Sequence, residues 1–430
     1  MTFTIHNGNC IDVMRSMPDN SVDSIVTDPP YELGFMGKSW DSTGIAFNVE
    51  VWAEALRVLK PGGHLLAFSG SRTYHRMAVA IEDAGFQIRD QIMWLYGSGF
   101  PKSLNVAKAL DKAEGLLQHE GKNMRNVTAD TTALTPSIKA SEYVPPEPQG
   151  EAAQQWQGWG TALKPAHEPI VLARKPLIGT VAANVLEWGT GGLNIDGSRV
   201  GSDEMTKTTS NGVKISENGS MSGANFEREI VGTVSDRFPA NLIHDGSDEV
   251  VEGFPSNVKD QVGMKKDVGD FRFITGDTET KQKFDYGKTD SGSAARFFYC
   301  AKASKRDRNE GLDGLPEVAR NKRAEGGKSV LEVSGATSKN HHPTVKPTDL
   351  MRYLVKLITP PGGTVLDPFT GSGSTGKGAV IEGFNFVGIE LDPDYVAIAT
   401  ARIQHQLDKL KTQDATRRYL KVDETNDKLF

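Results

Sequence analysis

The stretch TVLDPFTGSGSTGKGAVIEGFNFVGIE, at residues 364–390, decides the fold class. Its first residues, 364–367, have the apolar character of a buried strand, and a loop with the spacing Gly-x-Gly-x-x-Gly follows at residues 371–376. A short helical segment and a second apolar strand, residues 385–390, complete the pattern. A strand, a glycine loop, a helix and a strand in this order are typical of nucleotide-binding α/β folds.

The same alternation extends toward both ends of the chain. Strands are expected at residues 24–27, 64–68 and 91–96, and helices at residues 51–59, 72–84, 350–357 and 394–410. Strands that alternate with helices pair in parallel and carry helices on both faces of the sheet. The sequence therefore predicts a Rossmann-like α/β fold with a doubly wound, mostly parallel sheet.

The middle of the chain has a different composition. Polar residues without clear periodicity, which predict loops, fill residues 127–160, 201–225 and 255–293. Between them, an apolar run at residues 169–173 predicts ordered structure. We expect one α/β domain built from residues 1–105 and 295–430, with residues 106–294 as a long insertion.

The composition excludes several classes of protein. The chain has 430 residues, and 49 basic and 55 acidic side chains give a formal net charge of −6. Nucleic-acid binders are usually basic, but binding depends on where the charges lie. Two cysteines, Cys10 and Cys300, exclude a disulfide framework and a cysteine-based zinc site. We read no signal peptide and no membrane span, so a cytoplasmic protein is expected.

Two acidic residues narrow the meaning of the glycine loop. Glu390 stands at the end of the strand that follows the loop, where an acid can bind ribose hydroxyls in a dinucleotide site. Asp367 stands directly before the loop, where a carboxylate would repel a pyrophosphate. The same carboxylate can bind the amino group of S-adenosylmethionine, so this cofactor is the favoured ligand.

Two other interpretations of the loop are weaker. Gly376 and Lys377 nearly complete a P-loop, but Gly378 stands where that loop needs a Ser or Thr to hold magnesium. A simple tight turn between a strand and a helix would explain the glycines but would leave the two acids without a role.

A second motif, Asp28-Pro29-Pro30-Tyr31, directly follows a predicted strand. Alone it can be a stiff turn, because proline fixes its own backbone and restricts the preceding residue. The same rigidity can position chemistry on a nucleobase amino group, which is a poor nucleophile. The Asp28 carboxylate and the Pro29 carbonyl can accept its hydrogens, and Tyr31 can stack on the base. Catalysis would then rest on positioning and electrostatics.

Together the two motifs resemble those of the DNA amino-methyltransferases, which make N6-methyladenine or N4-methylcytosine. In that family Asp-Pro-Pro-Tyr is the catalytic motif and Asp-Pro-Phe-x-Gly-Ser-Gly is the cofactor motif. Here the catalytic motif comes first, as in the circularly permuted beta group, so the resemblance implies the class I methyltransferase fold. A third segment, residues 342–347, resembles the one that closes over the methionine end of the cofactor. The resemblance covers roughly residues 1–105 and 295–405 and includes phage and prophage members.

The resemblance assigns roles to particular residues. The catalytic residues would be Asp28, Pro29, Pro30 and Tyr31. S-adenosylmethionine would be bound by Asn9, Cys10, Asp28, His342, Thr344, Lys346, Asp367, Phe369, Thr370, Gly371, Ser372, Gly373, Glu390 and Leu391. One position departs from the family, which usually has Gly-Asp-Cys where this chain has Gly8-Asn9-Cys10. Asn9 can still form hydrogen bonds there, but it carries no charge.

The family association favours adenine over cytosine as the target base. Asp-Pro-Pro-Tyr is commoner in adenine-N6 enzymes, whereas Ser-Pro-Pro-Tyr is commoner in cytosine-N4 enzymes. Carbon-5 methylation of cytosine is disfavoured on chemical grounds, because it needs a thiolate and neither cysteine follows a proline. Cytosine-N4 methylation, an NAD-dependent oxidoreductase and a catalytically silent DNA-binding protein are the alternatives.

The expected partner is double-stranded DNA, from which the target base must flip out to reach the catalytic motif. Residues 34–41 are expected to contact the flipped nucleotide, and the insertion is the natural place for target recognition. The predicted DNA contacts are Lys38, Trp40, Lys302, Lys305 and Arg306. A metal at His341 and His342 is disfavoured. Members of the group are often dimers, and a restriction endonuclease partner is left open.

Overall fold

The computed structural model describes residues 1–33, 39–99, 103–116, 147–210, 228–256, 258–259, 291–301, 305–319 and 337–426. The chain divides into two compact units. The larger unit contains Met1–Gly97 and His167–Phe430, and the smaller unit contains Ser98–Ala166. Each unit is described by itself.

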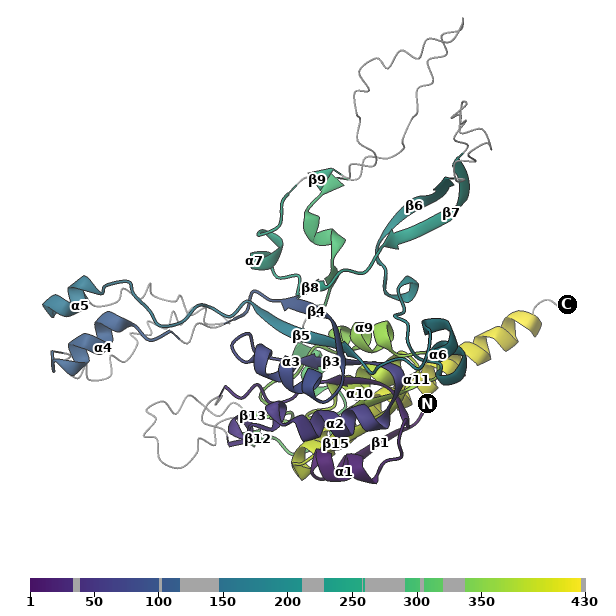
Figure 1. Ribbon diagram of the computed structural model, residues 1–430, viewed down its shortest axis with the longest axis horizontal. Coiled ribbons are helices and arrows are strands. Elements are labelled where there is room, and N and C mark those ends of the chain that lie inside the picture. Colours follow the sequence, from purple (N-terminus) through teal and green to yellow (C-terminus); the bar gives the residue numbers. More distant parts are fainter. Residues whose placement is uncertain are drawn as a thin grey trace, which may run out of the picture. The chain divides into compact units, whose positions relative to one another are not determined.

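The larger unit is built around one mixed sheet (Figure 1). In the part of the chain that the structure describes, this sheet has nine strands, in the order β1 (Phe3–Asn7), β15 (Asn385–Glu390), β14 (Thr364–Asp367), β2 (Val22–Thr27), β3 (Leu59–Phe68), β5 (His167–Arg174), β4 (Gln87–Leu95), β8 (Leu242–His244) and β11 (Tyr299–Cys300). Strand β5 runs antiparallel to both of its neighbours, and the other neighbouring pairs are parallel. The predicted mostly parallel α/β sheet is therefore confirmed.

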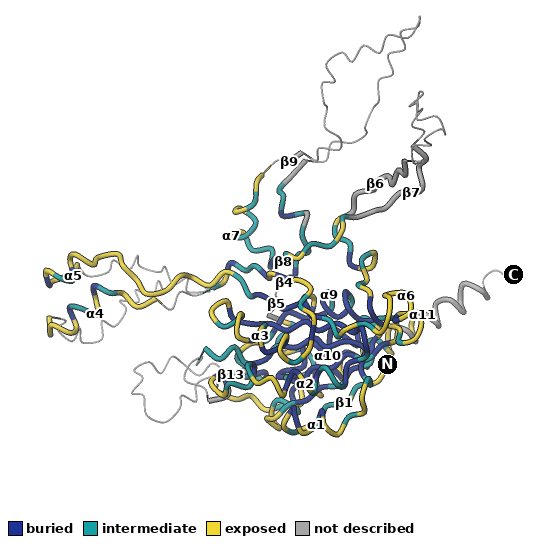
Figure 2. The backbone as a smooth tube through the Cα atoms, viewed as in Figure 1, coloured by how far each residue is buried: buried dark blue, intermediate teal, exposed yellow. Residues whose placement is uncertain are grey.

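Helices cover both faces of this sheet. One set is α1 (Cys10–Ser16), α2 (Val49–Val58) and α3 (Tyr74–Asp83), and the other is α9 (Thr348–Ile358), α10 (Ser374–Ile381) and α11 (Pro393–Asn426). Side chains alternate between the faces along a strand. Leu65 and Ala67 of β3 accordingly pack with the first set, whereas Leu66 and Phe68 pack with the second. The sheet is thus doubly wound, and Figure 2 shows the buried residues gathered in it and in the helices against it.

The strands at the centre of the sheet are buried on both faces. Every residue of β2 is buried, including the polar residues Asp23, Ser24 and Thr27. Each of these three side chains has a hydrogen-bond partner, as buried polar groups require. Strand β3 begins earlier than expected, at Leu59, so that residues 60–63 do not form a turn after α2. The pairing of β2 with β3 shifts in register between Val22 and Ser24, which accommodates this irregular start.

Two strands of the sheet come from the stretch that was expected to be an insertion. They are β5 and β8, and the apolar run at residues 169–173 lies buried within β5. Smaller elements of the larger unit are α6 (Val181–Trp188), α7 (Asp248–Val251), α8 (Lys305–Asn309), the strand pairs β6 (Val200–Ser210) with β7 (Arg228–Arg237), β9 (Val258–Lys259) with β10 (Ser291–Gly292) and β12 (Val318–Ala319) with β13 (Thr337–Ser338), and the 3₁₀ helices η2 (Ser39–Ser42), η3 (Ile45–Phe47), η4 (Asp196–Ser198) and η5 (Ala294–Phe297).

The described residues of the smaller unit form two helices, α4 (Val106–Ala113) and α5 (Glu151–Gln155). The buried carboxylate of Asp111 accepts hydrogen bonds from the backbone N–H groups of Gln149 and Gly150, which precede α5. The exposed rings of Trp156 and Trp159 contact each other edge to face, with centroids 5.0 Å apart. In neither unit is a described helix both long and apolar enough to cross a membrane.

Candidate active site

The carboxyl ends of β2, β14 and β15 bring the two sequence motifs together. Asp28 follows β2, Asp367 ends β14 and Glu390 ends β15. These strands are neighbours and run parallel, so their ends meet at one edge of the sheet, where ligands of open α/β sheets bind. Strand β5 is antiparallel and therefore begins at this same edge, which places Glu168 there.

The glycine loop is held by the acid at the end of β15. The Gly371 N–H donates to Glu390 Oε2 at 2.7 Å, and the Asp392 N–H donates to Glu390 Oε1 at 2.9 Å. Burial raises the pKa of the Glu390 carboxyl, and these backbone hydrogen bonds act in the opposite direction. Gly373 is the N-cap of α10 and has φ +79°, and a Cβ there would lie 2.9 Å from the Ala399 backbone. The loop therefore depends on glycine for both its conformation and its packing.

Asp367 joins the glycine loop to the strand that carries the catalytic motif. Its carboxylate accepts hydrogen bonds from Thr27 Oγ1 and Thr375 Oγ1, each at 2.6 Å, and from the Phe369 N–H at 3.1 Å. Only 1% of the residue is exposed. Burial raises the pKa of Asp367 to about 6 in spite of these donors, and the nearby charge of Asp28 acts in the same direction. The buried Asp367 carboxylate thus links β14, through hydrogen bonds, to β2 and α10.

His342 lies against the glycine loop. Burial lowers the pKa of its imidazole to about 3, so the ring is neutral at physiological pH. The Thr344 N–H donates to Nδ1 at 3.3 Å, which leaves the ring hydrogen on Nε2. A Cβ at Gly371 would lie 2.8 Å from that Nε2 atom. The ring also meets Tyr395 edge to face at 4.6 Å, so it is fixed between the loop and α11.

Asp28 is the centre of a compact polar cluster that also contains Tyr31, Glu168 and Lys346. Lys346 Nζ lies 2.7 Å from Asp28 Oδ2, 3.1 Å from Tyr31 Oη and 3.3 Å from Glu168 Oε2. Tyr31 Oη donates to Glu168 Oε2 at 2.7 Å. The ammonium also lies over the ring of Phe68, 4.9 Å from its centroid. The sequence predicted Lys346 as a cofactor ligand, but here its charge faces the catalytic motif.

The charges of this cluster do not cancel, because two carboxylates share one ammonium. Burial alone would lower the pKa of Lys346, but Asp28 and Glu168 outweigh it and raise that pKa, so Lys346 stays protonated. Burial raises the pKa of Asp28, and the second carboxylate, Glu168, adds to the effect while Lys346 opposes it. The pKa of Tyr31 is raised well above 10 by burial and by the same two carboxylates, so its hydroxyl remains a donor.

One oxygen of Asp28 has no partner among the residues that the structure describes. Oδ2 is bound by Lys346, whereas Oδ1 is buried and accepts no hydrogen bond. An unpaired buried carboxylate oxygen is costly, and such atoms often belong to functional sites. The Asp28 side chain as a whole is 16% exposed.

The backbone after the catalytic motif is held in a fixed shape. The Tyr31 carbonyl accepts a hydrogen bond from Thr73 Oγ1 at 2.8 Å. Glu32 has φ +56°, a left-handed conformation that is uncommon for residues other than glycine. Asp41 accepts the N–H groups of Glu32 and Leu33 at 2.9 and 3.2 Å and so supports that conformation. Several hydrogen bonds thus fix the position of Tyr31.

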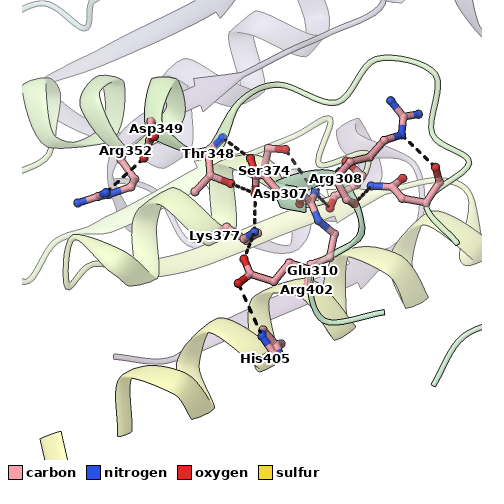
Figure 3. Close-up of polar contacts among 12 residues, drawn as sticks. Asp307, Arg308, Glu310, Thr348, Asp349, Arg352, Ser374, Lys377, Arg402 and His405 are labelled. Carbon is pink, nitrogen blue, oxygen red and sulfur yellow. Dashed lines mark hydrogen bonds and ion pairs between the residues drawn. The ribbon is translucent and has the colours of Figure 1, made fainter. Parts of the chain in front are cut away.

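Lys377 does not line the cofactor side of the loop. It is 1% exposed, and its ammonium lies 2.6 Å from Asp307 Oδ1 and 3.1 Å from Glu310 Oε2 (Figure 3). A P-loop lysine has to reach a nucleotide phosphate. The buried pairing of Lys377 therefore supports the rejection of the P-loop interpretation.

Helix α8 links the ion pairs of Lys377 to the glycine loop and to the segment at residues 342–347. Arg402 donates to the Ser372 carbonyl of the glycine loop at 2.5 Å and to the Asp307 carbonyl at 3.1 Å. Arg308 donates to the backbone carbonyls of Asn340 and His342. Asp307 and Arg308 therefore face the protein interior, whereas Arg306 is exposed.

The remaining predicted site residues lie at the start of α1, beside Glu390 or at positions whose side chains the structure does not describe. Asn9 is the N-cap of α1 and accepts the Ile11 N–H at 2.9 Å. Cys10 is buried, and burial raises its pKa to about 11. Leu391 is 69% exposed beside Glu390. Lys38 and Lys302 lie outside the described residues, and the side chains of Trp40 and Lys305 are likewise not described.

Three residues of the site were not foreseen from the sequence: Thr27, Thr375 and Glu168. Thr27 and Thr375 are small hydroxyl residues beside the two motifs, and their adjacency to Asp28 and to the glycines is the one signal that was present. Glu168 directly precedes the apolar run of β5, and its role depends on a strand order that local pattern does not reveal.

Gly371→Ala is expected to destabilise the protein more than Gly362→Ala. Both glycines are left-handed, at φ +51° and +72°, which costs other residues about 1–2 kcal/mol. Only at Gly371 would the new methyl group meet a neighbour, His342, whereas nothing lies within 4 Å of the Gly362 position. Urea unfolding of the two variants measures the difference. Equal losses of stability would contradict the tight contact between His342 and the loop.

Comparison with known proteins finds the same class of enzyme that the two motifs resemble. A family model described as DNA methylase matches residues 22–401. The type II methyltransferase M.XycI of Xanthomonas campestris pv. cyanopsidis is 42% identical over 79 residues, which are 18% of this chain and 26% of that protein. The DNA adenine methyltransferase YhdJ of Escherichia coli K12 is 40% identical over 63 residues, which are 15% of this chain and 21% of that protein.

The matches to these curated relatives thus span about a quarter of their lengths or less. Among solved structures, the cytosine-N4-specific PvuII DNA methyltransferase aligns over 94% of this chain and 86% of its own, with 13% identity and a TM-score of 0.42. The family model, in contrast, extends over most of this chain and includes the catalytic motif, the glycine loop and Glu390. The chain therefore belongs to the DNA methylase family.

Proposed function

We propose that this protein transfers a methyl group from S-adenosylmethionine to the N6 amino group of adenine in DNA. One observation carries the proposal: Asp28 of the Asp-Pro-Pro-Tyr motif holds one oxygen buried and unpaired while Lys346 binds the other. Membership of the DNA methylase family supports the reaction class. The name of the relative YhdJ, a DNA adenine methyltransferase, supports adenine as the target base.

The residues at the ends of β14 and β15 fit S-adenosylmethionine. Gly371 leaves room that a Cβ would fill, next to the Nε2–H group of His342. Glu390 is oriented by two backbone N–H groups, and a carboxylate so held retains lone pairs for ribose hydroxyls. We infer that Glu390 holds the ribose, that Asp367 favours the amino group by its charge, and that His342 faces the methionine end. The bound cofactor would supply an electrophilic methyl group.

The residues of the catalytic motif would activate the amino group of the base. Asp28 Oδ1 and the Pro29 carbonyl accept its hydrogens, which draws the nitrogen lone pair out of conjugation with the ring. The Tyr31 ring, held through its hydroxyl and its carbonyl, is available to stack on the base. After transfer the nitrogen loses a proton, and Asp28 Oδ1 is the nearest free acceptor in the cluster. A raised pKa makes Asp28 a better proton acceptor at neutral pH.

The order of the motifs supports the permuted beta group, because the catalytic strand β2 precedes the cofactor strand β14 along the chain while the two pair side by side. Within this proposal, residues 1–105 and 295–430 form the catalytic domain, to which β5 and β8 add strands. Residues 106–294 otherwise serve target recognition. Contact of Lys38, Trp40, Lys302, Lys305 and Arg306 with DNA stays a prediction, as do a homodimer, a restriction endonuclease partner and a cytoplasmic location.

A transfer assay tests the proposed reaction. Purified protein is incubated with unmethylated duplex DNA and S-adenosylmethionine that carries a labelled methyl group, and label on the DNA is counted. Parallel titrations compare the binding of S-adenosylmethionine and NADH. We expect labelled DNA and binding of S-adenosylmethionine only. Binding of NADH without transfer of label would favour the oxidoreductase alternative.

The affinity for S-adenosylmethionine is expected to fall as the pH decreases through about 6. Burial raises the pKa of Asp367 to about 6, so below that pH the carboxyl gains a proton and loses the charge that favours the cofactor's ammonium. Calorimetric titration between pH 5 and 8 measures the effect, and Asp367→Asn should flatten the profile near pH 6. Asp349→Asn, at a carboxylate that is 54% exposed, is the control and should keep the profile. An unchanged profile in Asp367→Asn would contradict this role.

A further inference from the structure

Glu168 lies at the catalytic edge of the sheet although it belongs to neither sequence motif. It is the second residue of β5, and it pairs in register with Trp94 of β4. Because β5 runs against its neighbours, its first residues lie beside the carboxyl ends of the parallel strands. The Glu168 side chain is 19% exposed, and it contacts Lys346 and Tyr31.

We propose that Glu168 is a positioning residue for methyl transfer. It holds the Lys346 ammonium and the Tyr31 hydroxyl on one side of Asp28, so that Oδ1 stays free for the amino group of the base. This inference rests on the proposed function and assigns a role to a residue outside the family motifs. Glu168 would act through its two neighbours and would not touch the substrate.

The directions of the hydrogen bonds support this role. The Lys346 ammonium donates hydrogen bonds to Asp28 Oδ2 and Tyr31 Oη, and it forms an ion pair with Glu168 Oε2 at 3.3 Å. Tyr31 Oη accepts from Lys346 and therefore directs its own hydrogen to Glu168 Oε2. With Glu168 in place, no hydrogen of this cluster is left for Asp28 Oδ1, which is the oxygen without a partner.

Removal of Glu168 would release donors next to Asp28. The Tyr31 hydroxyl and one ammonium hydrogen of Lys346 would lose their acceptor, and both groups already interact with Asp28. An unpaired donor in a buried site is costly, so it turns to the nearest free acceptor. Asp28 Oδ1 is that acceptor, and once bound it could no longer receive the amino group.

The charge of Glu168 has a second effect on Asp28. The groups that face Asp28 are Lys346 before α9, Tyr31 on its own loop, Glu168 on β5 and Asp367 on β14. Tyr96, after β4, also lies near these charges. Burial raises the pKa of Tyr96 to about 12, Glu168 acts in the same direction and Lys346 opposes it. Lys346 is the cation of this set and Glu168 competes with Asp28 for it. Loss of the Glu168 charge would therefore lower the pKa of Asp28.

The test compares Glu168→Gln with the unchanged protein and with a control, Glu187→Gln, at an exposed position on α6. Glutamine keeps the size of the side chain and one acceptor oxygen, but it removes the charge and replaces the other oxygen with an amide donor. Single-turnover methyl transfer to duplex DNA is measured from pH 5 to 8. The dissociation constant for S-adenosylmethionine and the midpoint of thermal unfolding are measured for each protein.

We expect Glu168→Gln to lower the single-turnover rate at least tenfold. Its cofactor affinity should stay within twofold, and the acid limb of its pH profile should move by half a pH unit or more toward lower pH. Glu187→Gln should match the unchanged protein. If Glu168→Gln does not fold, Tyr31→Phe removes the same hydrogen bond without exposing a charge and should also slow transfer at least tenfold.

Three results would overturn the inference. A rate within twofold and an unmoved acid limb would show that Glu168 does not position Asp28, and in the fallback a Tyr31→Phe rate within twofold would show the same. A slower rate with a lower unfolding midpoint and an unmoved acid limb would assign Glu168 to stability alone. Absence of transfer by the unchanged protein and by Glu187→Gln would instead overturn the proposed function, together with the inference that rests on it.

Discussion

Asp28→Ala is expected to reduce the rate of methyl transfer by about 10²–10³-fold, the usual effect of deleting one preorganised electrostatic group at a reacting centre. The change removes the unpaired Oδ1 atom that would receive the amino hydrogens. Single-turnover transfer to unmethylated DNA measures the rate. Asp12→Ala, at a surface carboxylate with 73% exposure on α1, is the matched control and should leave the rate unchanged.

Cofactor binding should largely survive Asp28→Ala. The ammonium of Lys346 keeps a carboxylate partner in Glu168, 3.3 Å away, so no buried cation is left alone. The glycine loop, held by Glu390 and Arg402, does not depend on Asp28. A titration with S-adenosylmethionine checks this expectation. Methyl transfer that persists in Asp28→Ala at more than a tenth of the original rate would contradict the assigned mechanism.

Lys377→Met is expected to lower the free energy of unfolding by about 3 kcal/mol, because it removes a buried cation and leaves two partly buried carboxylates without it. The loss lies at the low end for a broken buried ion pair. Arg402 still lies 3.7 Å from Asp307 Oδ1, and Lys409 still lies 3.1 Å from Glu310 Oε1. Urea unfolding at pH 7 measures the change. Lys411→Met, at a lysine with 73% exposure on α11, is the control and should change stability by less than about 0.5 kcal/mol.

The ion pair between Lys377 and Asp307 makes the free energy of unfolding depend on pH. Burial alone would raise the pKa of Asp307, but the hydrogen bonds from Lys377 and Thr348 outweigh it and lower that pKa below its ordinary value. A carboxyl with a lowered pKa in the folded state stabilises the protein above its unfolded pKa of about 3.9, and the contribution is lost as the pH falls further. Lys377→Met should therefore differ least from the unchanged protein near pH 3. A constant difference from pH 7 to pH 3 would contradict this account of the pairing.

Local pattern predicted the parts of the fold that depend on neighbours in sequence. The strand that ends at Asp367, the glycine loop and the strand that ends at Glu390 lie where the apolar runs and glycines place them. Helices α2 and α9 likewise lie close to the ranges expected for them, residues 51–59 and 350–357. Strand β5 differs, because an apolar run at residues 169–173 indicates a buried strand but neither its direction nor its neighbours.

In the site, too, the residues of local sequence motifs were predictable and the contacts between distant segments were not. Asp28 and the glycine loop stand out because rigid prolines and closely spaced glycines have few other uses. Glu168 could not be found in this way, since its contact with Lys346 joins residues that are far apart along the chain. Lys377 shows the converse, because its sequence position beside Gly376 imitates a phosphate loop while its partners, Asp307 and Glu310, lie on a distant segment.

The proposed reaction is tested most directly by identifying the methylated base. Unmethylated DNA is incubated with the protein and S-adenosylmethionine, digested to nucleosides and analysed by mass spectrometry beside a reaction with Asp28→Ala. We expect N6-methyladenine from the unchanged protein and a loss of about 10²–10³-fold in the variant. N4-methylcytosine as the product would contradict the proposed target base, and DNA without any methylated nucleoside would contradict the proposed activity.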